Sequence, residues 1–256
     1  MAPHRKVAGY RAGVPDDLFA VPRLAAIYDL VEGARPDLEH YLAMVDEFDA
    51  THVLDIGCGT GTFACALAER GVTVTAADPA GASLRVAQRK PGADRVRWIE
   101  CDAASLPAIG ADLAVMTGNV AMVFVDDAEW TAVLRAVRRA LVPGGRFVFE
   151  VRDPDRRGWA AWTPEATHST FRLDDGTTLD YWVEVTDVAL PWVSFVQHHR
   201  FSSDGAAHAS TSTLRFRTRT EVAASLLDAG FVVDDVRDAP DRPGLEHVFV
   251  ARRPAT

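Results

Sequence analysis

A glycine-rich loop between an apolar run and a helix-forming segment constrains this chain more than any other feature. Residues 53–56 have the length and apolar character of a buried strand, and the loop 57–61, Gly-Cys-Gly-Thr-Gly, follows directly. Residues 62–70 then favour a helix that ends at Gly71. Glycine lets the backbone approach a ligand, and the first helical turn offers free N–H groups, so this succession predicts a nucleotide cradle. The alternative is a tight turn without a ligand.

The spacing of the glycines indicates which nucleotide the loop suits. A dinucleotide loop follows the pattern G-x-G-x-x-G, in which the third glycine packs the helix against the strand. Here Thr62 stands at that position, and the pattern is G-x-G-x-G with Asp55 ahead of it. A carboxylate at the edge of the loop repels a pyrophosphate but attracts a cation or an amino group.

This stretch resembles the first motif of the class I S-adenosylmethionine-dependent methyltransferases, whose cofactor carries a sulfonium and an amino group but no phosphate. The resemblance covers residues 53–151 by motif and the rest of the chain by the order of its elements. It implies S-adenosylmethionine as the cofactor and S-adenosylhomocysteine as the product. The cofactor contacts expected in this loop are Asp55, Gly57, Cys58, Gly59 and Gly61.

An acid ends the second predicted strand. Residues 72–77 form an apolar run that leads into Asp78 and Pro79. A carboxylate at the carboxyl end of this strand is placed to accept hydrogen bonds from both ribose hydroxyls, in dehydrogenases and methyltransferases alike. Asp78, with Pro79 beside it, therefore predicts a nucleoside without choosing between these two classes.

A second acid follows the strand predicted over residues 95–99. The resemblance assigns this position to the adenine amino group of the cofactor. Asp102 matches the position best, with Ala103 beside it, and Glu100 is the alternative.

The fourth predicted strand, residues 113–116, leads into a small polar tip. Ligands bind at the carboxyl ends of the strands in open α/β sheets, so we expect this tip to face the transferred group. Thr117 and Gly118 are predicted to contact the cofactor, and Asn119 the substrate. A turn made by Gly118 and Asn119 without a ligand is the alternative.

Two helices are predicted ahead of the first strand, because apolar residues recur with helical spacing over 24–31 and 38–48. The residues before them, rich in proline and glycine, suggest a loose arm or lid. Tyr28 is similar to the tyrosine of a Tyr-Asp pair in many small-molecule methyltransferases, where it helps to close the cofactor site; plain helix packing is the alternative. Arg35 is a candidate for the cofactor carboxylate, unless it is solvated.

The alternation of helix and strand stops near residue 154, and the pattern becomes all-β. Four strands joined by hairpin-like turns are predicted over residues 170–173, 177–188, 192–201 and 208–217. Apolar and basic residues alternate at the end of the last strand, which predicts one buried and one solvated face. The insertion resembles that of methyltransferases for amino sugars, glycine and other small metabolites, where it roofs the acceptor pocket or mediates assembly.

The chain closes with a helix capped by Thr218 and Glu221 and with two strands over 231–236 and 246–251. The predicted fold class is α/β: a Rossmann-like, doubly wound seven-stranded sheet with N-terminal helices and an inserted antiparallel β-sheet. Its predicted parts are an N-terminal arm and helices covering the cofactor site (1–50), the S-adenosylmethionine-binding core (51–155), the β insertion (156–217) and a segment completing the core sheet (218–256).

Methyl transfer from a sulfonium is an in-line displacement, so positioning and the exclusion of water supply most of the acceleration. An amine acceptor needs only to arrive unprotonated, whereas a hydroxyl benefits from a general base worth about 10²–10⁴-fold. The candidate catalytic residues are His198 and His199, which lie on an inserted strand where one of the two must point inward. A surface or core position without catalysis is the alternative for each.

The acceptor pocket has three further candidates. Arg152 ends the fifth predicted strand, where it can meet an acidic substrate or pair with a neighbouring acid. Trp159 and Tyr181 can wall an apolar pocket, unless they form the core of the inserted sheet. We expect no metal, because residues 117–119 do not supply the carboxylates that a metal-dependent mechanism needs at this edge.

Composition limits the partners. A net charge of -9 argues against nucleic acid or an anionic membrane as the main partner, and we find neither a signal peptide nor a membrane-spanning run. The three cysteines lack the spacing of metal ligands and suit reduced thiols in the cytoplasm. We therefore expect a cytoplasmic protein with a small-molecule acceptor, in which the inserted sheet is a candidate homodimer interface.

Together these patterns predict an S-adenosylmethionine-dependent methyltransferase that acts on a nitrogen or oxygen of a small metabolite. Two alternatives stay open. A non-catalytic regulator would keep the same cradle and bind the cofactor without turnover. An NAD-dependent oxidoreductase is disfavoured because Thr62 replaces the third glycine of its loop.

Overall fold

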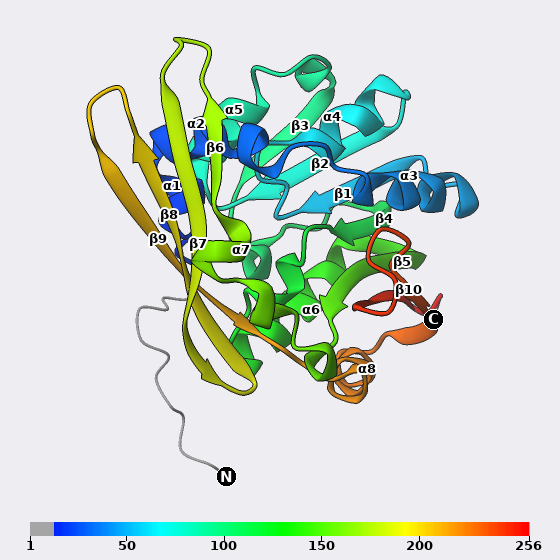
Figure 1. The fold of residues 1–256 in the computed structure, drawn as a ribbon. Helices are drawn as coiled ribbons and strands as arrows, with labels where there is room; N and C mark the ends of the chain where they lie inside the picture. The colour runs from blue at the N-terminus through cyan, green and yellow to red at the C-terminus, as the bar shows by residue number, and fades with distance from the viewer. Residues whose placement is uncertain (1–12, 256) are drawn as a thin grey trace.

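The computed structural model describes residues 13–255, which form two sheets (Figure 1). The larger one, sheet A, has seven strands in the order β10-β11-β5-β4-β1-β2-β3. Strands β1 to β5 pair in parallel, and β11 lies antiparallel between β5 and β10. The strands are β1 (His52–Ile56), β2 (Thr73–Asp78), β3 (Val96–Glu100), β4 (Ala111–Met116), β5 (Leu141–Arg152), β10 (Val232–Asp238) and β11 (Glu246–Arg252).

The central strands of sheet A are buried on both faces, as the crossover helices of a parallel sheet require. The helices of this core are α3 (Asp37–Glu47), α4 (Thr62–Glu69), α5 (Gly81–Ala87), α6 (Asp127–Ala140) and α8 (Arg219–Asp228). On β1, Val53 packs on one side with α3 and α4, and Leu54 packs on the other side with α6 and α8.

Local signals in the sequence account for the N-terminal ends of α6 and α8. The Asp126 side chain accepts hydrogen bonds from the backbone N–H groups at the start of α6. The predicted capping box of α8 is confirmed: the Thr218 side chain accepts from the Glu221 N–H, and the Glu221 carboxylate accepts from the Thr218 N–H.

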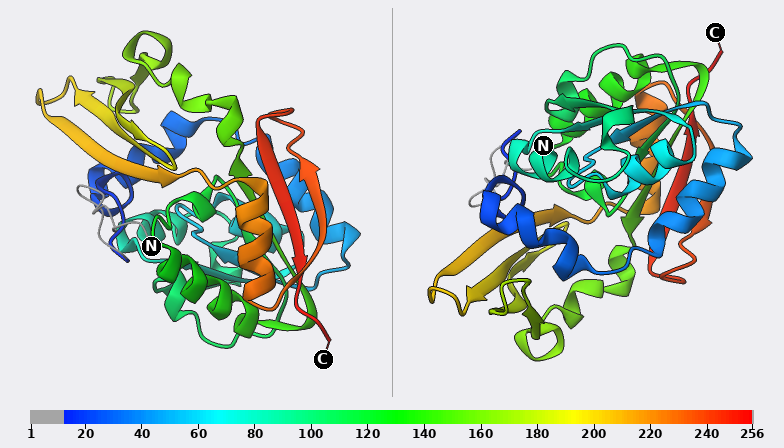
Figure 2. Two further views of the ribbon diagram at one scale, coloured as in Figure 1. Left: turned by 90° about the horizontal axis from the view of Figure 1, so that it is seen from below. Right: turned by 90° about the horizontal axis from the view of Figure 1, so that it is seen from above.

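The predicted insertion is the second sheet, sheet B. Its four antiparallel strands follow one another as β6 (Ser169–Arg172), β7 (Thr178–Ala189), β8 (Trp192–Phe201) and β9 (Ala207–Arg215). Sheet B stands beside the core, and α1 (Asp17–Ala20) and α2 (Pro22–Glu32) run between the two (Figure 2). A short helix, α7 (Pro164–Thr167), leads into β6. The predicted fold class is confirmed.

The predicted alternation at the end of the last inserted strand is wrong. Strand β9 ends at Arg215, and both Phe216 and Arg217 are buried. Arg217 Nη2 donates to the carbonyl oxygen of Phe124 at 2.7 Å, and its guanidinium lies over the Trp130 ring, 5.2 Å from the centroid. Arginine tolerates burial here because its donors find carbonyls and its planar head stacks on an aromatic face.

Of the predicted loose arm or lid, the described part is packed and lines the cavity as a lid would, whereas residues 1–12 lie outside the described part of the chain. Leu18 of α1 is buried, and its N–H donates to Ser210 Oγ at 2.8 Å. The Ser212 hydroxyl donates to the Asp16 carboxylate, and the Ser83 hydroxyl donates to the Phe19 carbonyl at 3.0 Å. These contacts fix residues 16–20 between sheet B and the core.

Candidate functional site

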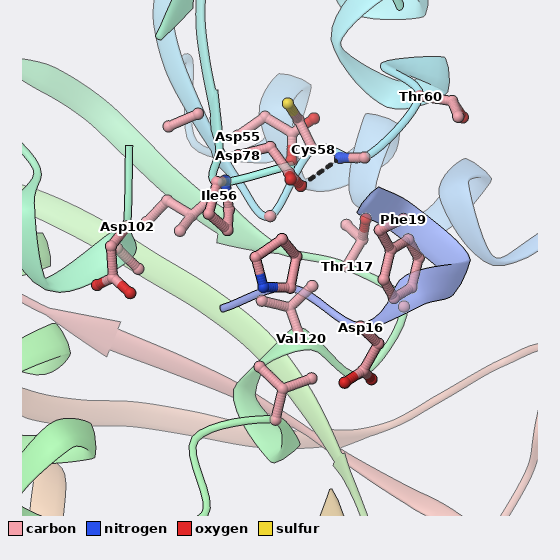
Figure 3. Close-up of a pocket in the computed structure, with 18 of the residues that line it drawn as sticks. Asp16, Phe19, Asp55, Ile56, Cys58, Thr60, Asp78, Asp102, Thr117 and Val120 are labelled. Atoms are coloured by element: carbon pink, nitrogen blue, oxygen red, sulfur yellow. Dashed lines mark hydrogen bonds between the residues drawn. The ribbon is translucent and has the colours of Figure 1, made fainter. Parts of the chain in front are cut away.

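A cavity of about 220 Å³ opens at the carboxyl ends of β1, β2 and β4, under α1 and α2. Figure 3 shows Asp55, Cys58 and Asp78 on one side of it, and Asp16 and Phe19 of the α1 region on another. The predicted cofactor residues that line this cavity are Tyr28, Arg35, Asp55, Gly57, Cys58, Gly59, Asp78, Pro79, Asp102, Ala103, Thr117 and Gly118.

The glycines of the loop occupy three different environments. A Cβ on Gly57 would lie 2.7 Å from the Val120 side chain, whereas a Cβ on Gly59 would meet no atom within 4 Å. Gly61 does not line the cavity, and its Cβ would lie 2.6 Å from the Trp98 ring. Gly59 therefore leaves room for a ligand, whereas Gly61, predicted as a cofactor contact, lets α4 pack closely on β3.

Asp55 is a buried carboxylate with no hydrogen-bond partner within residues 13–255. Its side chain is 1% exposed, and neither oxygen has a hydrogen-bond partner among the described residues. Burial, reinforced by the nearby Asp78 carboxylate, raises the pKa of Asp55 to about 7. A buried acid in this state gains most from a cationic ligand, so the site fits a cofactor that carries an amino group and a sulfonium.

Asp78 is held by the loop that it faces. Its Oδ2 accepts from the Gly59 N–H at 2.8 Å and its Oδ1 accepts from the Ala80 N–H at 2.7 Å. Burial raises the pKa of Asp78, and these two hydrogen bonds oppose that shift. Since each carboxylate oxygen can accept a second hydrogen bond, Asp78 retains capacity for two hydroxyls.

Asp102 lies on another wall of the cavity (Figure 3). Its Oδ1 accepts from the Ala104 N–H at 2.7 Å, which fixes the orientation of the carboxylate. Its Oδ2 would lie 2.9 Å from a Cβ on Gly13, so the N-terminal segment closes over this acid.

Tyr28 and Arg35 line the same cavity from the N-terminal helices and the loop after them. The Tyr28 ring packs 5.5 Å from the Phe19 ring, and burial raises the pKa of its hydroxyl. Arg35 donates to both carboxylate oxygens of Asp37 at 2.6 to 3.1 Å, so its charge already has a partner. Tyr28 thus combines helix packing with a place in the cavity wall.

Two buried glutamates support the tip of β4. The Glu150 carboxyl accepts from the Asn119 N–H and from the Tyr41 hydroxyl, and burial raises the pKa of Glu150 to about 8. The Asn119 amide donates to Glu246 Oε1 at 3.1 Å. Asn119, predicted as a substrate contact, therefore faces this buried network rather than the cavity that Thr117 and Gly118 line.

The other predicted substrate residues are also away from the cavity. Arg152 Nε lies 3.5 Å from Glu246, and the guanidinium stacks over Trp162 at 5.0 Å. Trp159 is buried edge-on against Phe216, with the centroids 4.6 Å apart. The hydroxyl of Tyr181 accepts from Gln197 at 3.1 Å within sheet B. Each of these residues makes structural contacts instead of lining the cavity. Strand alternation and aromatic content in the sequence do not distinguish these two roles.

The two histidines point to opposite faces of β8, as the strand period predicts. His199 is fully buried, 5.3 Å from the Tyr181 ring, and burial lowers its pKa to about 4. His198 stacks on Trp182 at 4.7 Å and lies 3.5 Å from Glu184. Neither lines the cavity, so the structure does not bring the predicted catalytic pair to the site.

Several cavity residues were not predicted from the sequence. They come from the α1 region, the β4–α6 connection and β9, and they are Asp16, Phe19, Val120, Phe124, Thr211 and Thr213. Only the tertiary fold brings these distant segments together. Within residues 13–255, no group of three His, Cys, Asp or Glu side chains is arranged to hold a metal ion, and no helix is long and apolar enough to cross a membrane.

Comparison with known proteins identifies the core. Residues 53–145 match a family model described as a methyltransferase domain. The cypemycin N-terminal methyltransferase of a Streptomyces species is 34% identical over 131 residues, which cover 50% of this chain and 54% of that protein. The ubiquinone biosynthesis O-methyltransferase of Idiomarina loihiensis is 30% identical over 151 residues, covering 54% and 60%. The chain thus spans little more than half the length of these relatives.

Solved structures resemble the whole fold. The sugar N-methyltransferase KedS8 of a Streptoalloteichus species superposes with a TM-score of 0.74 at 20% identity, covering 98% of this chain and 99% of that one. The CcbJ methyltransferase of Streptomyces caelestis gives 0.73 at 22% identity, covering 91% and 96%. The amino pentose methyltransferase CalS10 of Micromonospora echinaspora, solved with S-adenosylmethionine bound, gives 0.68 at 21% identity, covering 89% and 96%. The resemblance to class I methyltransferases is confirmed.

Proposed function

Because residues 53–145 match a methyltransferase-domain model, we propose that this chain is a class I S-adenosylmethionine-dependent methyltransferase that transfers a methyl group to a nitrogen or oxygen of a small-molecule metabolite. One observation carries the proposal. Asp55 is buried at the cavity with both oxygens unpartnered among the described residues. A buried carboxylate of this kind attracts a cationic ligand. A nicotinamide dinucleotide would instead place its anionic pyrophosphate in this loop, where the carboxylate repels it.

Each part of the cofactor would be held by different residues of the cavity. Asp55 would face its cationic groups, Asp78 would accept hydrogen bonds from the ribose hydroxyls, and Asp102 would accept one from the adenine amino group. Thr117 and Gly118 would contact the methionine end. When bound, the cofactor supplies an electrophilic methyl group on its sulfonium. The protein then contributes orientation and the exclusion of water, which are sufficient to accelerate an in-line displacement strongly.

We favour nitrogen as the acceptor atom. A hydroxyl acceptor benefits from a general base, and neither His198 nor His199, the bases predicted from the sequence, lines the cavity. An amine that arrives unprotonated needs no such base. KedS8 is named a sugar N-methyltransferase, CalS10 an amino pentose methyltransferase and the cypemycin relative an N-terminal methyltransferase, and these names support the same choice.

The proposal also covers the cellular compartment and the oligomeric state of the protein. Cys58, Cys65 and Cys101 are free thiols, which supports a reducing compartment such as the cytoplasm. Sheet B, the inserted sheet, is the face that we propose for a homodimer, which gel filtration with light scattering would detect.

The test is a calorimetric titration of S-adenosylhomocysteine into the protein, with NADH as the control titrant. We expect micromolar binding of S-adenosylhomocysteine and none of NADH. A panel of amines and alcohols incubated with S-adenosylmethionine and followed by mass spectrometry then identifies the acceptor class. Binding of NADH, or of neither compound, would overturn the cofactor assignment; binding without turnover of any acceptor would favour the non-catalytic alternative.

A further inference from the structure

Helices α1 and α2 pack with sheet B as one unit, which we call the roof. Leu18 and Leu24 share an apolar cluster with Leu179 and Phe201 of sheet B. At the start of α2, Arg23 Nη1 donates to Asp204 Oδ2 at 2.6 Å, and Asp204 lies in the turn between β8 and β9. The roof therefore combines residues 17–32 with an insertion far away in the sequence.

One side of the roof joins the core through donors to backbone carbonyls. Trp192 Nε1 and Arg215 Nη1 donate to the Val125 carbonyl at 3.2 and 3.1 Å, and Arg217 donates to the Phe124 carbonyl. These contacts lie close to the segment that joins β9 of sheet B to α8 of the core. The backbone itself therefore also holds the roof to the core on this side.

The other side of the roof meets the glycine loop through Asp29 of α2. Thr60 Oγ1, in the loop, donates to Asp29 Oδ1 at 2.6 Å. Lys90 Nζ lies 2.6 Å from Asp29 Oδ2 and donates to Thr62 Oγ1 at 2.8 Å. Thr60 is 3% exposed and lines the cavity. This cluster of Asp29, Thr60, Thr62 and Lys90, which we call the Asp29 latch, therefore ties α2 to the glycine loop.

Helix α2 also contacts α5 of the core, but a hollow borders the latch. This second hollow is lined in part by Tyr28, Asp29, Thr62 and Lys90. Leu24, Ile27 and Val31 of α2 belong to the apolar cluster with sheet B, and none of them lines this hollow. Polar contacts therefore fasten α2 to the glycine loop where apolar packing is incomplete, and the neighbouring Tyr28 reaches the main cavity from the same turn.

We propose that Asp29 is a positioning residue that, through Thr60 and Lys90, holds α2 and Tyr28 over the bound cofactor and slows its release. The identity of the cofactor rests on the proposed function; the fastening of α2 does not. Asp29 touches the loop and not the reacting atoms, so its loss weakens retention of the cofactor without removing a contact to the acceptor.

The test compares S-adenosylhomocysteine release from wild type, Asp29→Ala and Asp29→Asn by stopped-flow displacement. We expect Asp29→Ala to raise the dissociation rate and Kd about threefold to tenfold, the range for partly exposed charged hydrogen bonds. Asp29→Asn can still accept a hydrogen bond from Thr60 but loses the charge that pairs with Lys90. Its dissociation rate should lie between those of wild type and Asp29→Ala. Adding Thr60→Val to Asp29→Ala should change the rate less than Thr60→Val does alone.

Asp204→Ala is the matched control, because it removes an ion pair from the same helix on the side that faces sheet B. We expect release to be unchanged in this variant. Equal effects of Asp29→Ala and Asp204→Ala, or unchanged release in Asp29→Ala, would overturn the proposal. Should Asp29→Ala fail to fold, Lys90→Met replaces it.

Amide hydrogen exchange without any ligand separates this inference from the cofactor assignment. Loss of the latch should speed exchange in residues 22–32 of Asp29→Ala and leave it unchanged in Asp204→Ala. Wild type that does not bind S-adenosylhomocysteine would overturn the proposed function, and unchanged exchange would overturn the latch.

Discussion

At the scale of single residues, Asp55 is the cavity acid whose burial makes the stability of the protein depend on pH. The ordinary pKa of an aspartate is 3.8, whereas burial raises that of Asp55 to about 7. Between these two values the unfolded chain has released the proton and the folded chain has kept it. The stability that Asp55 contributes is therefore complete below about pH 4 and is lost as the pH rises through about 7.

We expect Asp55→Asn to remove this pH dependence, because the amide is of similar size and does not titrate. Between about pH 5 and about pH 7.5 the melting temperature of the variant should fall less than that of wild type, and at the upper end the variant should be the more stable protein. Thermal melts of both proteins without ligand measure the difference. Parallel curves would show that Asp55 is not the titrating group.

At the scale of elements, the glycine loop divides its functions between two of its glycines. Gly59 and Gly61 both have positive φ, of 52° and 76°. Open space faces Gly59, whereas Trp98 and Ala87 face Gly61. The first position is therefore adapted to a ligand, and the second to the packing of α4.

We expect Gly61→Ala to lower the free energy of unfolding by about 1–3 kcal/mol, because a Cβ there is both strained and crowded. Gly59→Ala should cost about 1 kcal/mol from its φ alone but weaken S-adenosylhomocysteine binding at least about tenfold, since its Cβ enters the cavity. Urea denaturation and calorimetry on the two variants provide the comparison. A larger loss of binding in Gly61→Ala and a larger loss of stability in Gly59→Ala would contradict this assignment.

The elements themselves were largely predictable from the sequence. Hydrophobic period, turn residues and the Thr218 capping box are local signals, and they predicted the strands of both sheets. The limits of local signals appear at Arg217, whose burial depends on a carbonyl of Phe124 many residues away. The place of Asp55, Asp78 and Asp102 on the cavity was predictable because the motif fixes these acids at or near strand ends. The far wall of the cavity was not, because Asp16 and Thr211 meet there only through tertiary packing.

At the scale of the whole molecule, the two sheets enclose a cavity whose charge is unbalanced. Asp16, Asp55, Asp78 and Asp102 line it. Within residues 13–255 the only cationic side chain that lines it is Arg35, which pairs with Asp37 at 2.6 Å. The chain as a whole has a net charge of -9, so its field adds to that of the cavity.

The excess of acids in the cavity affects the exchange of S-adenosylhomocysteine for S-adenosylmethionine. S-adenosylmethionine carries one net positive charge, and its product carries none, because transfer of the methyl group discharges the sulfonium. We expect the KM for S-adenosylmethionine to rise between about 50 mM and about 500 mM salt, while the inhibition constant of S-adenosylhomocysteine changes little. Initial rates at several salt concentrations measure both constants, and equal salt dependence of the two would refute the argument. On the proposed function, each turnover would remove the charge that attracts the cofactor, and at low salt the next cationic molecule would compete favourably with the neutral product for the same acids.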